Sequence, residues 1–256
     1  MEHLQTLSGK VALVTGASRG IGAGIAIVLA RYGADVALNY VRGKEQAEAV
    51  CRDIEALGRK ALPIQADVTD KNSTQKMVAE VEQVLGPVSI LVNNAGHNPV
   101  RTILEIEEED WDWVLDLNLK AYYRCTKSVI RGMMERKDGR IINITSISGQ
   151  RGGLSGDVDY SAAKAGIMGF TRALARWAAP SGILVNAIAP GYIVTEQLIE
   201  LVNQNPERFT KRIEDIPLKR LGTPEEIGEV VAFLAGPGGS YIVGEVITVN
   251  GGIHIA

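Results

Sequence analysis

Tyr160 and Lys164 are the pair of residues in this 256-residue sequence best suited to move a proton. They lie four positions apart in a segment with helical periodicity, so they share one face of the expected helix. A tyrosine titrates at about pH 10, and a nearby ammonium makes it a better acid and base at neutral pH because it stabilises the phenolate. Lowering the pKa of Tyr160 by ~2–3 units takes roughly 3–4 kcal/mol, which a close lysine in a shielded site can supply, whereas a surface pair would be only a contact between side chains.

A serine hydroxyl is expected beside this pair. Ser146 ends an apolar, strand-like run, and the carboxyl ends of strands line the ligand crevice of open α/β sheets. From there its hydroxyl can donate a hydrogen bond to a carbonyl oxygen that becomes an alkoxide. Ser148 is a second hydroxyl nearby that can assist.

Three glycines predict a turn that binds phosphate. Gly16, Gly20 and Gly22 stand between an apolar run at 11–15 and a periodic stretch at 21–32, the strand–turn–helix context of dinucleotide binding. Glycine lets the backbone approach a pyrophosphate, and a helix N-terminus attracts the anion. The Gly-Lys-Ser/Thr of a P-loop is missing, which disfavours an ATPase. The contacts expected here are Gly16, Ser18, Arg19, Gly20, Ile21 and Gly22.

The end of the second strand predicts which dinucleotide is bound. NAD-binding sheets usually carry an acid there to hold the ribose 2′-hydroxyl, but this chain has Asn39 and Tyr40 followed by Arg42. Arg19 and Arg42 can both face a 2′-phosphate. We therefore expect NADP(H) to be preferred, with NAD(H) as the alternative.

Apolar runs alternate with helical segments along the whole chain. Continuously apolar strands are covered on both faces, which predicts a doubly wound parallel sheet between two helix layers. We expect one α/β domain spanning 1–256, with a lid over the substrate at about 192–222, where a long polar stretch has no clear strand. The seven expected strands are 11–15, 35–40, 61–65, 88–92, 140–145, 184–188 and 246–249, and the main helices are 21–32, 44–57, 71–85, 107–135, 160–178 and 224–234.

Composition excludes several other classes of protein. The net charge of −3 gives no footprint for nucleic acid or an anionic membrane, and two cysteines with three histidines favour neither a disulfide framework nor a metal site. No apolar run reaches the ~18–20 residues of a membrane span, and the first ten residues lack the apolar core of a secretory signal. We expect a soluble, cytoplasmic protein without a catalytic metal.

Several of these motifs, taken together, resemble the short-chain dehydrogenases/reductases over essentially the whole chain. The resemblance implies a Rossmann fold with strand order 3-2-1-4-5-6-7 and a homotetramer. It implies that Tyr160 is the acid/base, that Lys164 binds the nicotinamide ribose and depresses the pKa of Tyr160, and that Ser146 polarises the carbonyl. Asn118 is expected to hold a water that continues the proton relay. The motifs are the turn at 15–22, Asn93-Asn94-Ala95-Gly96, Asn118, Ser146, Tyr160, Lys164 and Pro190-Gly191.

The same resemblance assigns further cofactor contacts. It places two residues at the adenine, three beside the adenine ribose, and four around the nicotinamide and its carboxamide. It also favours Ser146 over Ser148, because Ser146 precedes Gly149 by three residues as in the family pattern. In order, the contacts are Asp67 and Val68; Asn94, Ala95 and Gly96; and Pro190, Gly191, Ile193 and Thr195.

The bacterial 3-oxoacyl-acyl-carrier-protein reductases are the most similar subgroup, which implies a 3-oxoacyl thioester as substrate and acyl carrier protein as partner. Some positions depart from that subgroup: Pro180-Ser181-Gly182 replaces a usual basic docking residue, although Lys137 keeps a second one, and Trp177 replaces a usual Glu. A polyol, sugar or gluconate-type dehydrogenase therefore stays as the alternative. A non-catalytic dinucleotide-binding sensor is the alternative from another class, and the presence of the whole tetrad of Asn118, Ser146, Tyr160 and Lys164 favours an enzyme.

Overall fold

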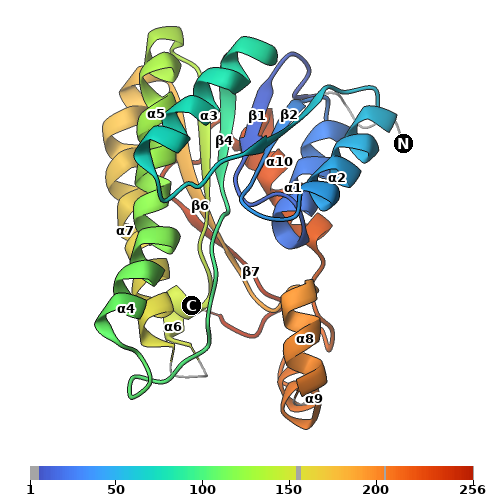
Figure 1. Ribbon diagram of the computed structural model, residues 1–256, viewed down its shortest axis with the longest axis vertical. Coiled ribbons are helices and arrows are strands. Elements are labelled where there is room, and N and C mark those ends of the chain that lie inside the picture. Colours follow the sequence, from blue (N-terminus) through green and yellow to red (C-terminus); the bar gives the residue numbers. More distant parts are fainter. Residues whose placement is uncertain (1–5, 154–156, 205, 256) are drawn as a thin grey trace.

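Seven parallel strands form the centre of the computed structural model, which describes residues 6–153, 157–204 and 206–255 (Figure 1). Their order, β3-β2-β1-β4-β5-β6-β7, confirms the predicted doubly wound Rossmann sheet. The crossover between β3 and β4 brings the chain back to the middle of the sheet, so the ends of β1 and β4 lie side by side. The strands are β1 (Val11–Val14), β2 (Asp35–Tyr40), β3 (Ala61–Gln65), β4 (Val88–Asn93), β5 (Gly139–Ile144), β6 (Ile183–Pro190) and β7 (Val246–Val249).

Helices cover both faces of this sheet. Alternate residues of β1 belong to different cores: Ala12 and Val14 pack with α1, α2 and α10, whereas Val11 and Leu13 pack with α3, α5 and α7. This two-sided burial explains why the strands read as continuous apolar runs. The main helices are α1 (Gly20–Arg31), α2 (Lys44–Ala56), α3 (Lys71–Val84), α4 (Glu108–Leu115), α5 (Ala121–Arg136), α7 (Val158–Ala178) and α10 (Pro224–Ala235).

Short elements complete the carboxyl edge of the sheet. A one-turn helix, α6 (Ser148–Arg151), follows β5, and the expected lid contains α8 (Glu196–Gln204) and α9 (Pro206–Glu214). In Figure 1 these two helices project together below the sheet, away from α4. Short 3-10 turns occur at η2 (Ala179–Ser181) and η3 (Pro237–Gly239).

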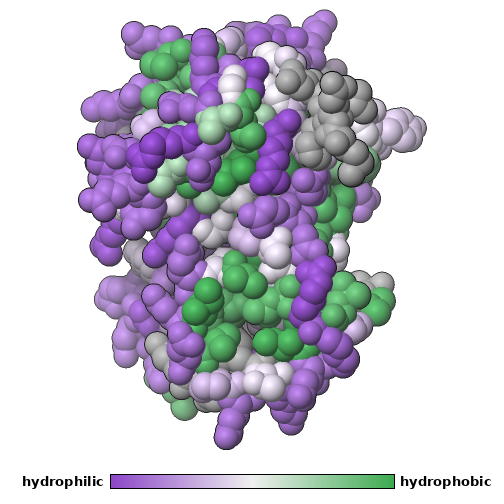
Figure 2. Space-filling view, turned by 90° about the vertical axis from the view of Figure 1, so that its right-hand side faces the viewer, coloured by the Kyte–Doolittle hydropathy of each residue, from purple (hydrophilic) through white to green (hydrophobic). Residues whose placement is uncertain are grey.

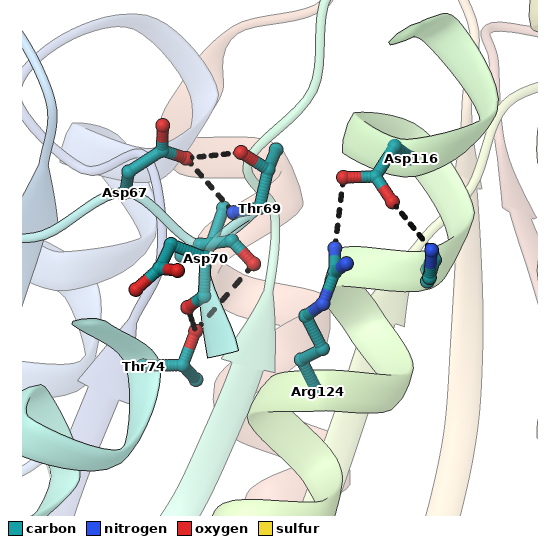
Figure 3. Close-up of polar contacts among 8 residues, drawn as sticks. Asp67, Thr69, Asp70, Thr74, Asp116 and Arg124 are labelled. Atoms are coloured by element: carbon teal, nitrogen blue, oxygen red, sulfur yellow. Dashed lines mark hydrogen bonds and ion pairs between the residues drawn. The ribbon is translucent and has the colours of Figure 1, made fainter. Parts of the chain in front are cut away.

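The helix expected over 107–135 is not regular throughout. A π-helical turn, η1 (Asp116–Lys120), separates α4 from α5 and contains the buried Asn118. Asp116 holds this turn, because its carboxylate accepts a hydrogen bond from Arg124 at 2.8 Å and forms an ion pair with Lys120 at 3.2 Å (Figure 3). A π turn inside a helix displaces the residues beyond it, and such turns are frequent at functional sites.

A capping box fixes the start of α10. The Thr223 hydroxyl accepts a hydrogen bond from the backbone N–H of Glu226, and the Glu226 carboxylate accepts one from the backbone N–H of Thr223. The first turn of α10 packs on α1, where a side chain at Gly24 would meet Pro224 at 2.4 Å. The capping box therefore places α10 against the helix that follows the phosphate turn.

None of the helices within the described ranges is both long and apolar enough to cross a membrane.

Candidate active site

The glycine turn after β1 has the shape of a phosphate cradle. Gly16 and Gly20 have φ values of 63° and 57°, the left-handed region that glycine adopts without strain. A Cβ atom at Gly22 would lie 2.4 Å from the carbonyl oxygen of Gly16, so only glycine fits there. The amide of Asn94 donates hydrogen bonds to the carbonyls of Thr15 and Gly16 and ties the turn to the end of β4. The turn thus fits a pyrophosphate.

The N-terminus of α1 opens onto this cradle. Arg19 is its N-cap and makes no side-chain capping bond, so the first N–H groups remain available to an anion. Thr195 lies over the turn, because a Cβ atom at Gly20 would be 3.3 Å from its methyl group. The structure therefore brings together the phosphate turn and the segment after β6, two regions far apart in the sequence.

The end of β2 lies next to the cradle. The Asn39 side chain is buried and accepts a hydrogen bond from the Gly16 N–H at 3.3 Å, while its amide donates to the Ala66 carbonyl. The Ser18 hydroxyl donates to the Arg42 carbonyl at 3.4 Å. Tyr40 is buried, whereas the side chains of Arg19 and Arg42 are exposed. Two exposed guanidinium groups thus lie beside the end of β2, next to the cradle.

Asp67 and Val68 follow β3 along the same edge of the sheet. The Asp67 carboxylate accepts hydrogen bonds from both the N–H and the hydroxyl of Thr69, at 2.8 and 2.7 Å (Figure 3). Val68 is buried beneath it. These contacts fix an Asx-type turn at the position where the resemblance expects adenine.

Lys164 is held inside the protein beside Tyr160. Its Nζ donates to the Ile144 carbonyl at 3.0 Å and to the Tyr122 hydroxyl at 3.3 Å, and it lies 5.5 Å from the centroid of the Tyr160 ring. The side chain of Lys164 is 3% exposed. The pair expected from the i, i+4 spacing is therefore assembled on one face of α7.

The depression of the Tyr160 pKa that the resemblance implies is wrong, because the pKa is raised. Burial raises the pKa of Tyr160 to about 12; a hydrogen bond with Ser146 opposes this rise, and the charge of Asp157 adds to it. Burial lowers the pKa of Lys164 to about 7. Desolvation disfavours the charged form of each group, so Tyr160 is protonated at neutral pH.

Ser146 is the serine that contacts the tyrosine. The Ser148 N–H donates to the Ser146 hydroxyl oxygen at 3.0 Å, so Ser148 belongs to the start of α6 and orients its neighbour. A Cβ atom at Gly149 would lie 2.6 Å from the Lys164 backbone, so α6 packs directly on α7. The Thr145 hydroxyl donates to the Lys164 carbonyl at 2.7 Å and joins the same two elements.

Asn118 lies at the inner end of this group. Its amide donates to the carbonyls of His97 and Val114, and its carbonyl oxygen accepts the His97 N–H. A Cβ atom at Gly96 would be 2.6 Å from that oxygen and 3.4 Å from Lys164 Nζ. The Asn118 oxygen and the lysine ammonium therefore border the same point, which is open only because residue 96 is glycine.

The segment after β6 packs against the end of β5 and the last residues of the chain that the structure describes. The Pro190 carbonyl accepts a hydrogen bond from the Ile147 N–H at 3.2 Å. Gly191 packs closely on Asn250, because a Cβ atom added at Gly191 would lie 2.8 Å from that residue. Ile193 is buried and pairs with Gly222 at the base of the lid. The segment after β6 therefore lies next to the Ser146 strand end. At the neighbouring glycine turn, a Cβ atom added at Gly16 would lie 2.9 Å from Ala95.

Tyr122 is a residue at this site that the sequence analysis missed. Its side chain is fully buried, and its hydroxyl contacts Lys164 Nζ and the Ile144 carbonyl. It is four residues beyond Asn118, across the junction of the π turn and α5. The four-residue spacing from Asn118 could have indicated that Tyr122 faces the site, because residues four apart share a helix face.

Comparisons with known proteins find relatives over nearly the whole chain. The family model described as "Enoyl-(Acyl carrier protein) reductase" matches residues 16–254. A 3-oxoacyl-[acyl-carrier-protein] reductase from Staphylococcus epidermidis is 44% identical over 96% of this chain and 99% of its own length. A metagenomic blue fluorescent protein solved with NADPH is 38% identical, with a TM-score of 0.90 over 98% of this chain and all of that one. A structure assigned as a gluconate dehydrogenase from Agrobacterium tumefaciens is 33% identical, with a TM-score of 0.93 over 99% of both chains.

Proposed function

The chain belongs to the short-chain dehydrogenase/reductase family of NAD(P)-dependent oxidoreductases, and from this premise we propose that it reduces 3-oxoacyl thioesters with NADPH. The observation that carries the proposal is the convergence of Tyr160, Lys164 and Ser146 at the strand ends beside a glycine cradle. The similarity to a 3-oxoacyl-[acyl-carrier-protein] reductase over nearly the whole chain supports the substrate class.

The proposed reaction adds hydrogen to a ketone in two parts. NADPH supplies a hydride to the carbonyl carbon. Ser146 donates a hydrogen bond to the carbonyl oxygen and favours the alkoxide, and Tyr160 gives that oxygen its phenolic proton. Lys164 balances the phenolate that remains, and Asn118 borders the route by which water restores the proton. A protonated Tyr160 is the form that this direction needs, in keeping with its raised pKa.

The lid favours an apolar substrate over a sugar. Val194, Ile199 and Leu218 are large apolar side chains that stay exposed on or beside the lid. Figure 2 shows apolar residues gathered on the lower half of this side of the molecule, the half that α8 and α9 occupy in Figure 1. Exposed apolar surface of this kind suits a binding groove for an acyl chain, because a polyhydroxy substrate gains little from it.

The exposed arginines favour NADP(H) over NAD(H). Arg19 and Arg42 flank the end of β2, where no carboxylate is present to hold a free 2′-hydroxyl. A guanidinium binds a phosphate by charge-assisted hydrogen bonds and so favours the cofactor with the 2′-phosphate.

A matrix of two cofactors and several substrates tests the proposal. We expect acetoacetyl thioesters to be reduced with NADPH at a kcat/KM at least about tenfold above that with NADH, which corresponds to about 1.4 kcal/mol. Simple ketones, aldoses and keto-gluconates run in parallel are the competing substrates. Faster reduction of a keto-gluconate would instead support the gluconate-type alternative, which the structural likeness to a protein assigned as a gluconate dehydrogenase favours.

We also propose that acyl carrier protein delivers the substrate and that the chain assembles as a homotetramer. Trp177 on α7 and Phe233 on α10 are exposed aromatic side chains, a kind enriched at protein interfaces. Light scattering tests the assembly, with four copies of the 27.5-kDa chain expected.

A further inference from the structure

Tyr122 enters the site from α5, the helix that faces the catalytic helix α7. Its hydroxyl oxygen lies 2.9 Å from the Ile144 carbonyl oxygen and 3.3 Å from Lys164 Nζ, and the same carbonyl lies 3.0 Å from that Nζ. The three atoms form a closed triangle of hydrogen-bond partners. The Lys164 ammonium also lies over the Tyr122 ring, 5.3 Å from its centroid.

A count of protons fixes the direction of each hydrogen bond. A carbonyl can only accept, so the single proton of the Tyr122 phenol goes to Ile144. The phenol oxygen then faces Lys164 with a lone pair and accepts one of the three N–H groups of the ammonium. Ile144 accepts the second, which leaves the third for the side where Tyr160 and the cofactor crevice lie.

We propose that Tyr122 is a positioning residue for the reaction, whose hydroxyl holds the Lys164 ammonium charged and aimed at Tyr160. The inference rests on the roles proposed above for Tyr160 and Lys164. It adds an acceptor that a buried ammonium requires, because a cation removed from water is stabilised only when its N–H groups are paired.

The two tyrosines on either side of Lys164 have different tasks. Burial raises the pKa of Tyr122 well above its ordinary value, and the charge of Tyr160 raises it further. Tyr122 therefore stays protonated while Tyr160 titrates. Its neighbour Cys125 stays neutral too, since burial raises the pKa of that thiol to about 12. Tyr122 and Tyr160 are the titratable groups in contact with the lysine among the described residues. On the elements packed around it, Cys125 lies beside Tyr122, Asp157 acts on Tyr160, and His97 is bonded to Asn118.

Tyr122→Phe tests the hydroxyl alone, because the ring and its contact with the ammonium remain. The assay is alcohol oxidation with NADP⁺ and a 3-hydroxyacyl thioester, where Tyr160 must be deprotonated and the rate rises with pH. Loss of an acceptor disfavours the ammonium, so the phenolate loses its support and the midpoint of the rise moves upward. We expect a shift of about one pH unit, and a rate about tenfold lower below the midpoint.

Tyr123→Phe is the matched control. Tyr123 adjoins Tyr122 on α5, accepts a hydrogen bond from Lys127 at 2.9 Å, and lies under its ammonium at 5.4 Å, but this pair is exposed. The same loss of a tyrosine–lysine hydrogen bond outside the site should leave the midpoint unchanged. Melting temperature and NADPH binding, measured on both variants, show whether each is folded.

The pH midpoint of the oxidation rate is the measurement that tests the proposed role of Tyr122. A midpoint unchanged in Tyr122→Phe overturns it, even if kcat or the melting temperature falls, because that pattern is a packing defect. An upward shift confined to Tyr122→Phe supports it. Tyr160→Phe in the same assay separates the two proposals: if that variant keeps its rate, the proposed role of Tyr160 fails rather than the role of Tyr122 alone.

Discussion

At the scale of single residues, burial rather than charge sets the protonation of the site. Tyr160 and Lys164 are both removed from water, which moves the pKa of the phenol to about 12 and that of the amine to about 7. Each shift favours the neutral form. The phenol of Tyr160 therefore keeps its proton at neutral pH, the form that the proposed carbonyl reduction needs.

Ser146 and Ser148 allow a matched test of carbonyl polarisation. Ser146→Ala removes the hydroxyl that contacts Tyr160, and we expect kcat for thioester reduction to fall by about 10²-fold. Ser148→Ala leaves the backbone N–H that donates to Ser146, so its kcat should stay within about threefold of wild type. Equal losses in the two variants would contradict the choice of Ser146.

Residue spacing predicted part of this site and missed another part. The Tyr160–Lys164 spacing and the position of Ser146 at a strand end were enough to predict that these three side chains lie in one site. Tyr122 was missed because its contact with Lys164 spans 42 positions of sequence and depends on how α5 and α7 pack. The pKa shift of Tyr160 was wrong in sign because the depth of its burial depends on the whole fold.

At the scale of elements, an irregular turn positions one residue of the site, and regular strands and helices form the framework around it. The strands and main helices follow from apolar runs and periodicity, and most of their bounds agree with expectation to within two residues. The π turn at Asp116–Lys120 was not expected, since hydrophobic periodicity gives little sign of one extra residue in a turn. That turn places Asn118 where its amide reaches both His97 and Val114.

The capping box of α10 gives a prediction at this scale. Thr223→Ala removes the acceptor for the Glu226 N–H, and we expect the free energy of unfolding to fall by about 1 kcal/mol, measured by urea denaturation. Thr210→Ala is the control, since the Thr210 hydroxyl donates to the Pro206 carbonyl in the first turn of α9 and takes no part in the capping box. That variant should stay within about 0.5 kcal/mol of wild type. A larger loss in the control would show that the capping box is not what stabilises this region.

At the scale of the whole molecule, the strand order creates the crevice. The chain leaves β1 in one direction through α1 and returns at β4 in the other, so the ends of β1 and β4 border an open edge. The phosphate turn, Gly96, Ser146 and the segment after β6 all lie along this edge. Alternation of strands and helices predicted the doubly wound sheet, whereas the strand order came from family resemblance. The inner structure of the lid, with α8 and α9, depended on packing that periodicity alone does not encode.

The central claim is that Tyr160 transfers the proton, and Tyr160→Phe tests it most directly. The change removes one hydroxyl and keeps the buried ring beside Lys164. Steady-state NADPH oxidation with an acetoacetyl thioester should show kcat reduced by at least about 10²-fold, while fluorescence titration shows NADPH bound with an affinity within about threefold of wild type. A kcat close to that of wild type, with cofactor binding intact, would contradict the account.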